Sequence, residues 1–434
     1  MTDKIIRGSG GPPPTPPSPT RAPDTLNSRQ FASIQDLLSE GEIEGFATPS
    51  KAGLTKGTTA YNNAALKDIF LNDTPILNAS ASNTSPGTAD FNFQNVSFAF
   101  KEGTANQTHI PGIESSESTT AVGVTVTTSA PVTRQITNTN VDAAKVTITF
   151  PQLQKATDQG DLLGSSVDLK IQVQYNSGGF NDIISDTITG RTADAYQKEY
   201  RVNITGAFPV DIRVVRVTAD STSDNLKDAF AFTSIAEIID DKQTYPNSAY
   251  TNLRLDSEQF SSIPKRAFRI RGVKVRIPAA NGGLTPTVDL QTGRVIYPAN
   301  YVFNGVMGAA QWCSCPALIL LDLLTTERYG FGTHITDSSL DLYSFVAASR
   351  YANEQVNDSR GGLEARFSCN VNIQGSIEAY TLINELAGVM RAFPIWSEGS
   401  VTITQDKPTD PSYLFSLANV GEGGFSYSGS SLKQ

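Results

Sequence analysis

The chain has 434 residues, a formal net charge of −9 and a sequence pI near 4.9. This length allows about three domains with cores of their own. The acidic balance disfavours a protein that binds phosphates over a broad surface. Apolar residues make up 39% of the chain, and no apolar run approaches the ~20 residues of a membrane helix, so we expect a soluble protein. The first residues lack the apolar core of a signal peptide, which indicates assembly in a cytoplasm.

The start of the chain is rich in proline, with PPPTPPSP at 12–19 and few apolar side chains. Such composition favours polyproline or disordered chain over a packed core. We therefore expect a proline-rich disordered arm over residues 1–28. The alternative is an extended strap onto a neighbouring subunit, although the sequence shows no docking anchor.

Ordered structure is expected from residue 31, and Gly41 and Gly45 bracket the point where a strand begins. Further along, residues 67–77 (KDIFLNDTPIL) predict a hairpin that turns at Asn72–Asp73.

Residues 78–250 are rich in Thr, Ser, Asn and Gly, and β-branched residues alternate with polar ones, as in KVTITF (145–150) and VDLKIQVQY (167–175). A period of two is typical of half-buried strands. Because such strands recur at short spacing, with turns such as NSGGFND (176–182), the segment predicts an antiparallel sandwich or barrel.

A basic strand is predicted over residues 265–277, with a bulge near Gly272 where the buried face changes. Six basic residues lie in it: Lys265, Arg266, Arg269, Arg271, Lys274 and Arg276. One interpretation is a solvated sheet face or a protected edge. The other is an interface with an acidic partner subunit, because arginine on a rigid strand pairs well with carboxylates.

Helical patterning appears late in the chain, at 316–330, 338–356 and 376–392. In the third segment we expect Ser376 as the N-cap and one apolar stripe, formed by Ile377, Tyr380, Ile383, Leu386, Ala387 and Met390. Two strands around a Glu398–Gly399 turn should follow at 393–404, which makes this domain α+β. Trp312 and Trp396 are expected to be packing residues.

The three cysteines, Cys313, Cys315 and Cys369, are too few for a disulfide framework. We expect buried free thiols. A Cys-x-Cys pair can begin a zinc site, but a closed site needs four ligands and only Cys369 and two histidines remain, so no metal or cofactor is expected.

A search for catalytic patterns finds no nucleophile elbow, phosphate-binding loop or zinc-protease helix. Both histidines, His109 and His334, fall in predicted loops. Three glutamates, Glu40, Glu42 and Glu44, would lie on one side of a strand, where like charges normally face water. The alternatives are an electrostatic role at a subunit interface or lumen and, less favoured, a catalytic role. We therefore expect no enzyme. Glycoside hydrolysis remains an alternative, since it needs only two suitably separated carboxylates.

Several segments resemble the tail-tip protein J family of phage lambda, and they occur in the same order along the chain. They are SEGEIEG (39–45), FLNDTPIL (70–77), PVTRQIT (131–137), TADSTSDNLKDAFAFTSIAEIIDDKQTYPNSA (218–249), LDSEQF (255–260), LLTTERYGFG (323–332), RFSCNVNI (366–373), MRAFPIW (390–396) and QDKP (405–408). Together they cover most of residues 29–434.

The resemblance implies a structural virion protein at the tip of a siphophage tail, assembled in the host cytoplasm. The family forms a homotrimeric hub that closes the tail tube, contacts the distal tail protein ring, the tape-measure protein and other tip proteins, and lets phage DNA pass. Its receptor-binding part lies further along a longer protein. Since this chain stops at Gln434, we expect contact with the bacterial receptor to reside in a part not present here.

The expected fold is α+β and mainly β, with several β-sandwich or barrel hub domains, an inserted β domain and a later α+β domain, arranged as a trimeric ring. The expected divisions are 29–79 with 250–300 (hub domain), 80–249 (inserted domain), 301–404 (α+β hub domain) and 405–434 (start of a further hub domain). Two other classes stay open: a carbohydrate-active depolymerase with two catalytic carboxylates, and a secreted adhesin, which the missing signal peptide disfavours.

Overall fold

A computed structural model describes most of the chain. The described residues are 20–28, 31–256, 259–260, 262–375, 377–397, 399–408, 413–416, 418–421 and 424. The predicted N-cap Ser376, the turn residue Glu398, and most of the predicted arm and of the expected further hub domain lie outside them. The fold is mainly β with a few helices, as expected, and no sheet in the described residues closes into a barrel. No helix among these residues is long and apolar enough to span a bilayer.

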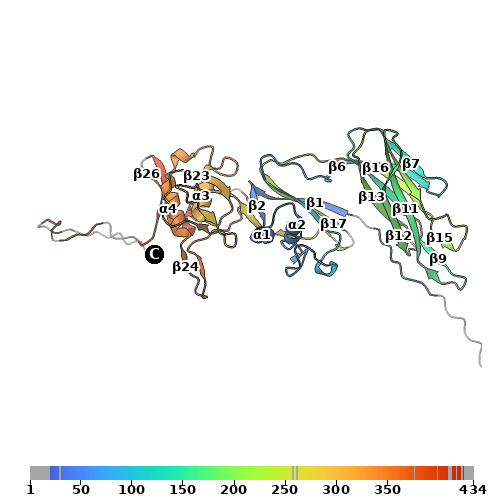
Figure 1. Ribbon diagram of the computed structural model, residues 1–434, viewed down its shortest axis with the longest axis horizontal. Coiled ribbons are helices and arrows are strands. Elements are labelled where there is room, and N and C mark those ends of the chain that lie inside the picture. The colour runs from blue at the N-terminus through green and yellow to red at the C-terminus, as the bar shows by residue number, and fades with distance from the viewer. Residues whose placement is uncertain are drawn as a thin grey trace, which may run out of the picture. The chain divides into compact units, whose positions relative to one another are not determined.

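The chain forms two compact units (Figure 1). The described residues of the first lie within 1–42, 46–49 and 54–270, and those of the second lie within 43–45, 50–53 and 271–434. The division at residue 270 falls inside the 250–300 segment that the sequence analysis assigned to one hub domain.

A three-stranded antiparallel sheet begins the first unit, in the order β1–β17–β5. Its strands are β1 (Phe31–Glu40), β17 (Ser248–Asp256) and β5 (Ser97–Glu102). Against it pack α2 (Thr59–Leu66) and the small sheet of β3 (Ile69–Leu71), β4 (Thr74–Pro75) and β18 (Arg266–Phe268). A short 3-10 helix, η1 (Thr88–Asp90), lies in the loop before β5.

The predicted hairpin at 67–77 is confirmed. Asn72 and Asp73 join β3 to β4 with φ of 48° and 65°, which is the left-handed geometry that a two-residue hairpin turn requires. The helix α2 was missed, although Thr58 caps it by accepting a hydrogen bond from the Tyr61 N–H at 3.2 Å. The five-residue helix α1 (Ala47–Lys51) was missed as well.

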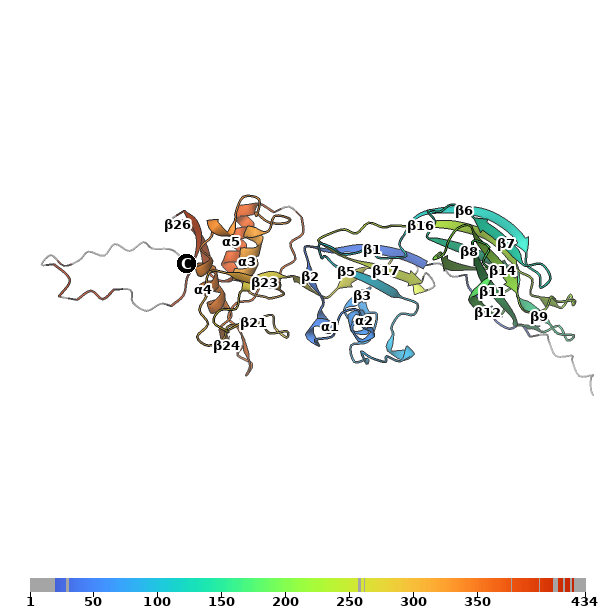
Figure 2. The same ribbon diagram turned by 45° about the horizontal axis from the view of Figure 1, so that its top comes forward.

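Two four-stranded antiparallel sheets form the inserted sandwich, in the orders β12–β11–β14–β7 and β13–β8–β16–β6 (Figure 2). Their strands are β6 (Glu114–Thr125), β7 (Val132–Ile136), β8 (Ala143–Phe150), β11 (Ser165–Tyr175), β12 (Asn181–Gly190), β13 (Tyr196–Asn203), β14 (Val210–Arg216) and β16 (Ala231–Asp240). A small sheet at one end joins β9 (Gln154–Ala156), β10 (Leu162–Leu163) and β15 (Leu226–Lys227).

Alternation explains why these residues form a sandwich. Val146 and Ile148 of β8 and Val167 and Leu169 of β11 are buried in one cluster, while the residues between them are more exposed. Each such buried side chain contributes about 1.5–3 kcal/mol. The predicted antiparallel sandwich is confirmed, and the predicted turn at 176–182 joins β11 to β12.

The second unit combines short hairpins with three helices. Three hairpins are β21 (Thr287–Val288) with β22 (Val295–Ile296), β24 (Gln355–Asn357) with β25 (Leu363–Ala365), and β26 (Ala392–Ser397) with β27 (Ser400–Gln405). β20 (Val275–Pro278) pairs antiparallel with β23 (Met307–Gln311), and the hairpin of β21 and β22 lies between them in the chain. The helices are α3 (Pro316–Thr325), α4 (Leu342–Ala352) and α5 (Ala379–Val389), and a 3-10 turn, η3 (Asp337–Ser339), precedes α4. Most of β2 (Ile43–Phe46), paired with β19 (Ile270–Val273), also belongs here.

Helix α3 is the centre of the second core: seven of its ten residues are buried, which explains why the segment is apolar on all sides. All three predicted helices and the predicted hairpin at 393–404 are present, but the predicted stripe on α5 is partly wrong. Leu386, Ala387 and Met390 are buried, whereas Tyr380 is 73% exposed and Ile377 precedes the helix. Trp396, predicted to pack, is 68% exposed.

Candidate functional site

The three predicted glutamates do not share a strand face. Glu40 ends β1, Gly41 follows with φ of 95°, and Glu42 lies outside any strand. Only Glu44 lies in β2. The prediction of one strand from 40 to 44 was wrong because the left-handed glycine interrupts the extended backbone. Glu40 accepts a hydrogen bond from Ser248, and Glu44 accepts one from Ser50 at 3.2 Å.

The predicted basic strand is divided into three short strands. β18, β19 and β20 pair with β3, β2 and β23 respectively. The breaks fall at Arg269 and Lys274, not at the bulge expected near Gly272. The first change of partner coincides with the point, at residue 270, where the segment passes from the first unit into the second. The second change takes place within the second unit.

In the first unit the arginines of this segment bind carboxylates of the same chain. Arg266 donates to both oxygens of Asp36, at 2.6 and 2.8 Å. Arg269 donates through Nε to Asp68 at 2.7 Å, and Asp68 is fully buried. Lys265 lies 3.7 Å from Asp73 in an exposed pair.

In the second unit Arg276 forms a two-pronged pair with Asp337, with both N–O distances at 2.8 Å. Arg271 is 5% exposed, stacks on Trp312 at 4.1 Å from the ring centre and donates to Ser50 and to the Leu290 carbonyl. These guanidinium groups therefore stabilise the fold of the chain itself, whether or not the segment also contacts a partner subunit.

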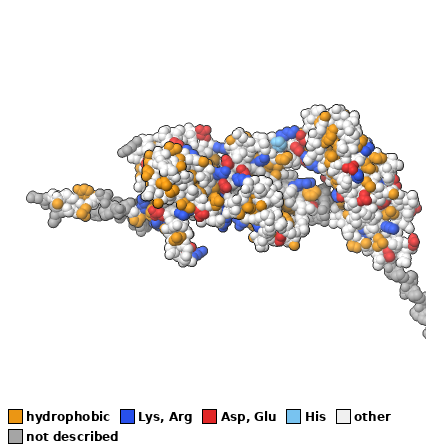
Figure 3. Space-filling view, in the orientation of Figure 1, with side chains coloured by type: hydrophobic (Ala, Val, Ile, Leu, Met, Phe, Trp, Pro, Cys, Tyr) orange, Lys and Arg blue, Asp and Glu red, His pale blue; other side chains and the backbone are white. Residues whose placement is uncertain are grey.

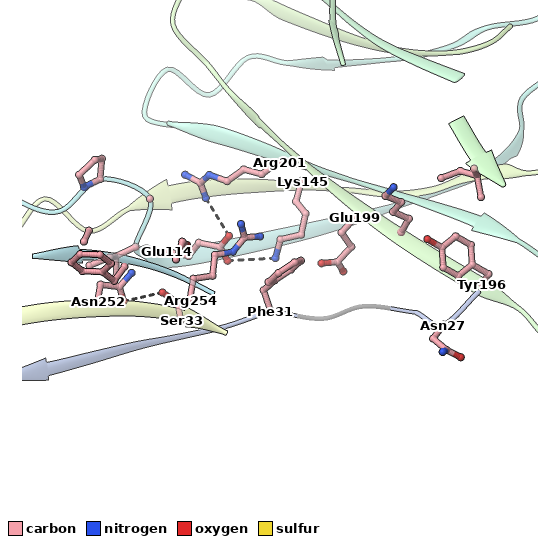
Figure 4. Close-up of a pocket in the computed structure, with 18 of the residues that line it drawn as sticks. Asn27, Phe31, Ser33, Glu114, Lys145, Tyr196, Glu199, Arg201, Asn252 and Arg254 are labelled. Carbon is pink, nitrogen blue, oxygen red and sulfur yellow. Dashed lines mark hydrogen bonds and ion pairs between the residues drawn. The ribbon is translucent and has the colours of Figure 1, made fainter. Parts of the chain in front are cut away.

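A larger hollow lies in the first unit, and we call it the first-unit cleft (Figure 4). Its volume is about 820 Å³, and its lining comes from β1, β5, β6, β8, β12, β13 and β17 and from residues 25–27 and 110–113. Figure 4 shows Lys145 and Arg201 pointing toward Glu114, and Arg254 beside Phe31.

Ion pairs dominate one wall of the first-unit cleft. Lys145 lies 2.7 Å from Glu117 and 3.4 Å from Glu114. Arg201 contacts Glu114 at 3.1 Å and Asp240 at 2.6 Å. Burial by itself would lower the pKa of Lys145, but the hydrogen bond to Glu117 and the nearby carboxylates outweigh it, so the pKa is raised. Each cation thus already faces two carboxylates, and the network has no excess positive charge with which to hold an anion.

On the opposite wall Arg254 stacks over Phe31, with the guanidinium carbon 4.0 Å from the ring centre. Ser33 donates to Asn252 at 3.0 Å below it. Cation–π contacts at exposed positions contribute about 0.5–1 kcal/mol. This wall therefore ties β1 to β17 through side chains as well as through backbone pairing.

Sequence reasoning did not find this network. Its members come from β6, β8, β13 and β16, which are separated by up to 126 residues between Glu114 and Asp240. No local motif marks them, because each residue taken singly is an ordinary charged residue on a polar strand face.

A smaller hollow in the second unit holds two carboxylates with opposite environments. Burial raises the pKa of Asp322, which accepts a hydrogen bond from the Tyr329 hydroxyl at 2.5 Å. The Arg276 guanidinium lowers the pKa of Asp337. Such opposed shifts are what acid–base catalysis uses, but both carboxylates here are held by partners from the protein itself.

The structure describes no group of three or more His, Cys, Asp or Glu residues arranged to hold a metal ion, within the residues that it covers. Cys313, Cys315 and Cys369 are buried and free, as predicted. Burial raises the pKa of all three thiols, which disfavours the reactive thiolate. His109 and His334 lie in loops and line neither hollow.

Residues 116–241 match the family model of the FNIII-A domain of tip attachment protein J. This range coincides with the inserted sandwich from β6 to β16. The chain is 30% identical over 435 aligned positions to tip attachment protein J of Escherichia phage SECphi27, covering 100% of this chain and 33% of that protein. It is also 30% identical to tip attachment protein J of Escherichia phage SECphi4, covering 98% of this chain and 34% of that protein.

Solved structures add nothing to this relationship. A structure titled "CBM4 structure and function" shares 12% identity with the chain and covers 41% of it, with a TM-score of 0.15. That score is too low to support a conclusion about fold or function.

The sandwich and the full-length alignment define the chain as a relative of phage tail proteins. It is similar to tip attachment protein J over its whole length, in agreement with the resemblance that the collinear segments indicated. The chain spans about a third of the length of the curated relatives that it matches.

Proposed function

We propose that the chain is a structural component of a siphophage tail tip, a hub that closes the tail tube, organises tip assembly and forms part of the conduit for DNA. The observation that carries this proposal is the alignment with two tip attachment proteins over essentially the whole chain. Host-receptor binding is assigned to other parts of a longer protein, and the role described here involves no covalent step and no cofactor.

The proposed assembly is a homotrimeric ring that docks on the distal tail protein ring and contacts the tape-measure protein and other tip proteins. An exposed apolar surface on the second unit supports an assembled state, and hydrophobic side chains are visible around β26 in Figure 3. Phe393 is 62% exposed, Ile395 46% and Trp396 68%. Phe393 and Ile395 share one face of β26, and large apolar side chains exposed together in this way are typical of surfaces that contact another protein.

Charge supports a conduit that does not retain DNA. Three copies of a chain with net charge −9 carry −27, and the arginines at 266, 269 and 276 are already paired with carboxylates. Unpaired cations attract phosphate most strongly, so a lumen built from this chain should let DNA slide. Figure 3 shows basic and acidic side chains interspersed on the visible face.

The proposal is tested by electron cryomicroscopy of intact phage particles that carry this chain. We expect three copies as a ring below the tail tube, with the distal tail ring above them. A strongly basic lumen would contradict the conduit argument, and a location away from the tip would overturn the proposal.

The depolymerase alternative is tested separately by incubating the purified chain with host capsule and lipopolysaccharide. We expect no release of reducing sugar, because Asp322 and Asp337 are held by Tyr329 and Arg276. Release that is abolished by Asp322→Asn would favour the enzyme.

A further inference from the structure

Residues 20–28 lie as an extended peptide against the inserted sandwich, and we call this segment the strap. Thr20 and Ala22 pair with Leu162 through backbone hydrogen bonds of 3.0 and 2.9 Å, in a parallel bridge centred on Arg21. Further along, the Thr25 and Leu26 N–H groups donate to the Arg191 carbonyl at 2.9 and 3.3 Å. This order differs from the disordered arm expected for residues 1–28.

Arg191 is the anchor beneath the strap. Its side chain is 2% exposed, and its Nη1 donates to the Ala22 carbonyl at 2.7 Å and to Asp24 at 2.6 Å. A buried guanidinium stays charged and is costly unless it is paired. Both of these acceptors belong to the strap, while the sandwich itself offers Gln154 at 3.3 Å.

The surface is shaped for close approach of a peptide. A β-carbon at Gly190 would lie 2.6 Å from the Thr25 hydroxyl and 2.8 Å from Leu26. The Leu26 side chain packs against the sandwich core, and the Ser28 hydroxyl accepts from the Gln197 N–H at 3.0 Å. Backbone pairing, a buried charge and an apolar contact therefore act together along nine residues.

We propose that the inserted sandwich carries a peptide-recognition groove whose ligand is the chain's own strap. The groove recognises the strap through the side chains of Asp24 and Leu26. The strap also lines the first-unit cleft at residues 25–27. It thereby restrains the sandwich against the start of β1.

Chain connectivity favours docking within one copy. Only two residues separate Ser28 from Phe31, so the two Cα atoms are at most about 11 Å apart. If two copies exchanged their straps, the β1 of the neighbouring copy would have to start equally close to this groove. When the strap binds the sandwich of its own copy, β1 already lies this close and nothing has to rearrange.

Amide hydrogen exchange of the full chain tests the groove. The double variant Asp24→Ala/Leu26→Ser changes only the strap, so it leaves the sandwich sequence intact. We expect at least about tenfold faster exchange in segments containing Leu162, Arg191 and Gln197, whose N–H groups donate to the strap. Exchange in β11 and β14 should be unchanged, and Asn27→Ala, an exposed neighbouring change, should have no effect. Equal exchange in the double variant and the wild type would overturn the proposal.

A cysteine pair identifies which copy supplies the strap. The Thr20 hydroxyl lies 2.8 Å from Asp161 Oδ1, so Thr20→Cys/Asp161→Cys should form a disulfide within one chain, found as a linked peptide in monomeric protein. The native cysteines are buried and will not compete. A disulfide between chains, or none at all, would refute docking within one copy.

Discussion

Arg216 and Asp228 form an ion pair that water hardly reaches, at the edge of the inserted sandwich. The Nη2–Oδ2 distance is 2.7 Å, and the two side chains are 1% and 6% exposed. The guanidinium also donates to the carbonyls of Thr218 and Asp228 and stacks on Phe230 at 5.7 Å. Removing Asp228 leaves the buried guanidinium without its only buried carboxylate partner among the described residues, because its other carboxylate contact, Asp220, is 43% exposed.

We expect Asp228→Ala to lower the free energy of unfolding of the sandwich by about 3–5 kcal/mol. The matched control is Asp220→Ala, because Asp220 contacts the same guanidinium at 3.2 Å but is 43% exposed, and its loss should cost under about 1 kcal/mol. Urea denaturation followed by hydrogen exchange in β14 measures both. Equal losses in the two variants would show that burial of the Asp228 pair does not matter.

Helix α5 offers a second comparison. Leu386 is 3% exposed in the second core, whereas Tyr380, on the same helix, is 73% exposed. We expect Leu386→Ala to cost about 2–4 kcal/mol of unfolding free energy, because it opens a cavity. Tyr380→Ala should stay within about 0.5 kcal/mol. Thermal denaturation of the two variants checks the difference. A large loss of unfolding free energy in Tyr380→Ala would mean that Tyr380 is buried, as the stripe predicted from the sequence requires.

The contrast between these residues shows what periodicity can and cannot determine. Alternation identified β8 and β11 because both sheets of the sandwich bury every second residue. On α5 the pattern located the helix but misplaced its buried face. The helix begins only at Ala379, and its buried residues start at Leu382. Tyr380 matches the period yet lies in the exposed first turn.

The ion pairs were beyond sequence reasoning for a different reason. Asp36 and Arg266 are separated by 230 positions in the sequence, and Asp68 and Arg269 by 201. The sequence shows that a cluster of arginines exists, but their acceptors depend on which strands become neighbours. The first-unit cleft was missed for the same reason, because its residues come from strands that are far apart in the sequence. The family segments could be recognised because each is a continuous stretch of sequence.

The exposed apolar surface at β26 leads to a prediction about association. Phe393 and Ile395 are opposite Thr404 and Thr402 on β27, and their exposure means that polar substitutions should leave the monomer's stability within about 0.5 kcal/mol of wild type. If this surface packs in the proposed trimer, Phe393→Ser/Ile395→Ser should shift sedimentation toward monomer. An Ile183→Ser control changes an apolar residue of the inserted sandwich that is 51% exposed, and it should not. Unchanged association of the double variant would remove β26 from the interface.

The two carboxylates of the second-unit hollow should respond oppositely to pH. The folded-state pKa of Asp322 is raised above its ordinary value of 3.8. Between these two values the folded state holds a proton that the unfolded state has lost, so stability falls as pH rises through this window. Asp322→Asn removes the titration and keeps an oxygen for the Tyr329 hydroxyl. The variant should therefore gain stability relative to wild type as pH rises above the ordinary pKa of 3.8.

Asp337 provides the control with the opposite sign. Arg276 lowers its folded-state pKa below 3.8, so its contribution is present above that value and is lost as pH falls through the lowered pKa. Asp337→Asn should thus be destabilising at pH 7, by under about 1 kcal/mol because the pair is partly exposed, and the difference from wild type should vanish in acid. Urea midpoints of both variants and wild type between pH 3 and 7 give the two slopes. If this stability difference changed with pH in the same direction for both variants, burial would not be the cause of the shift at Asp322. Ionising a buried carboxylate destabilises the fold, whereas ionising one that is paired with an arginine stabilises it.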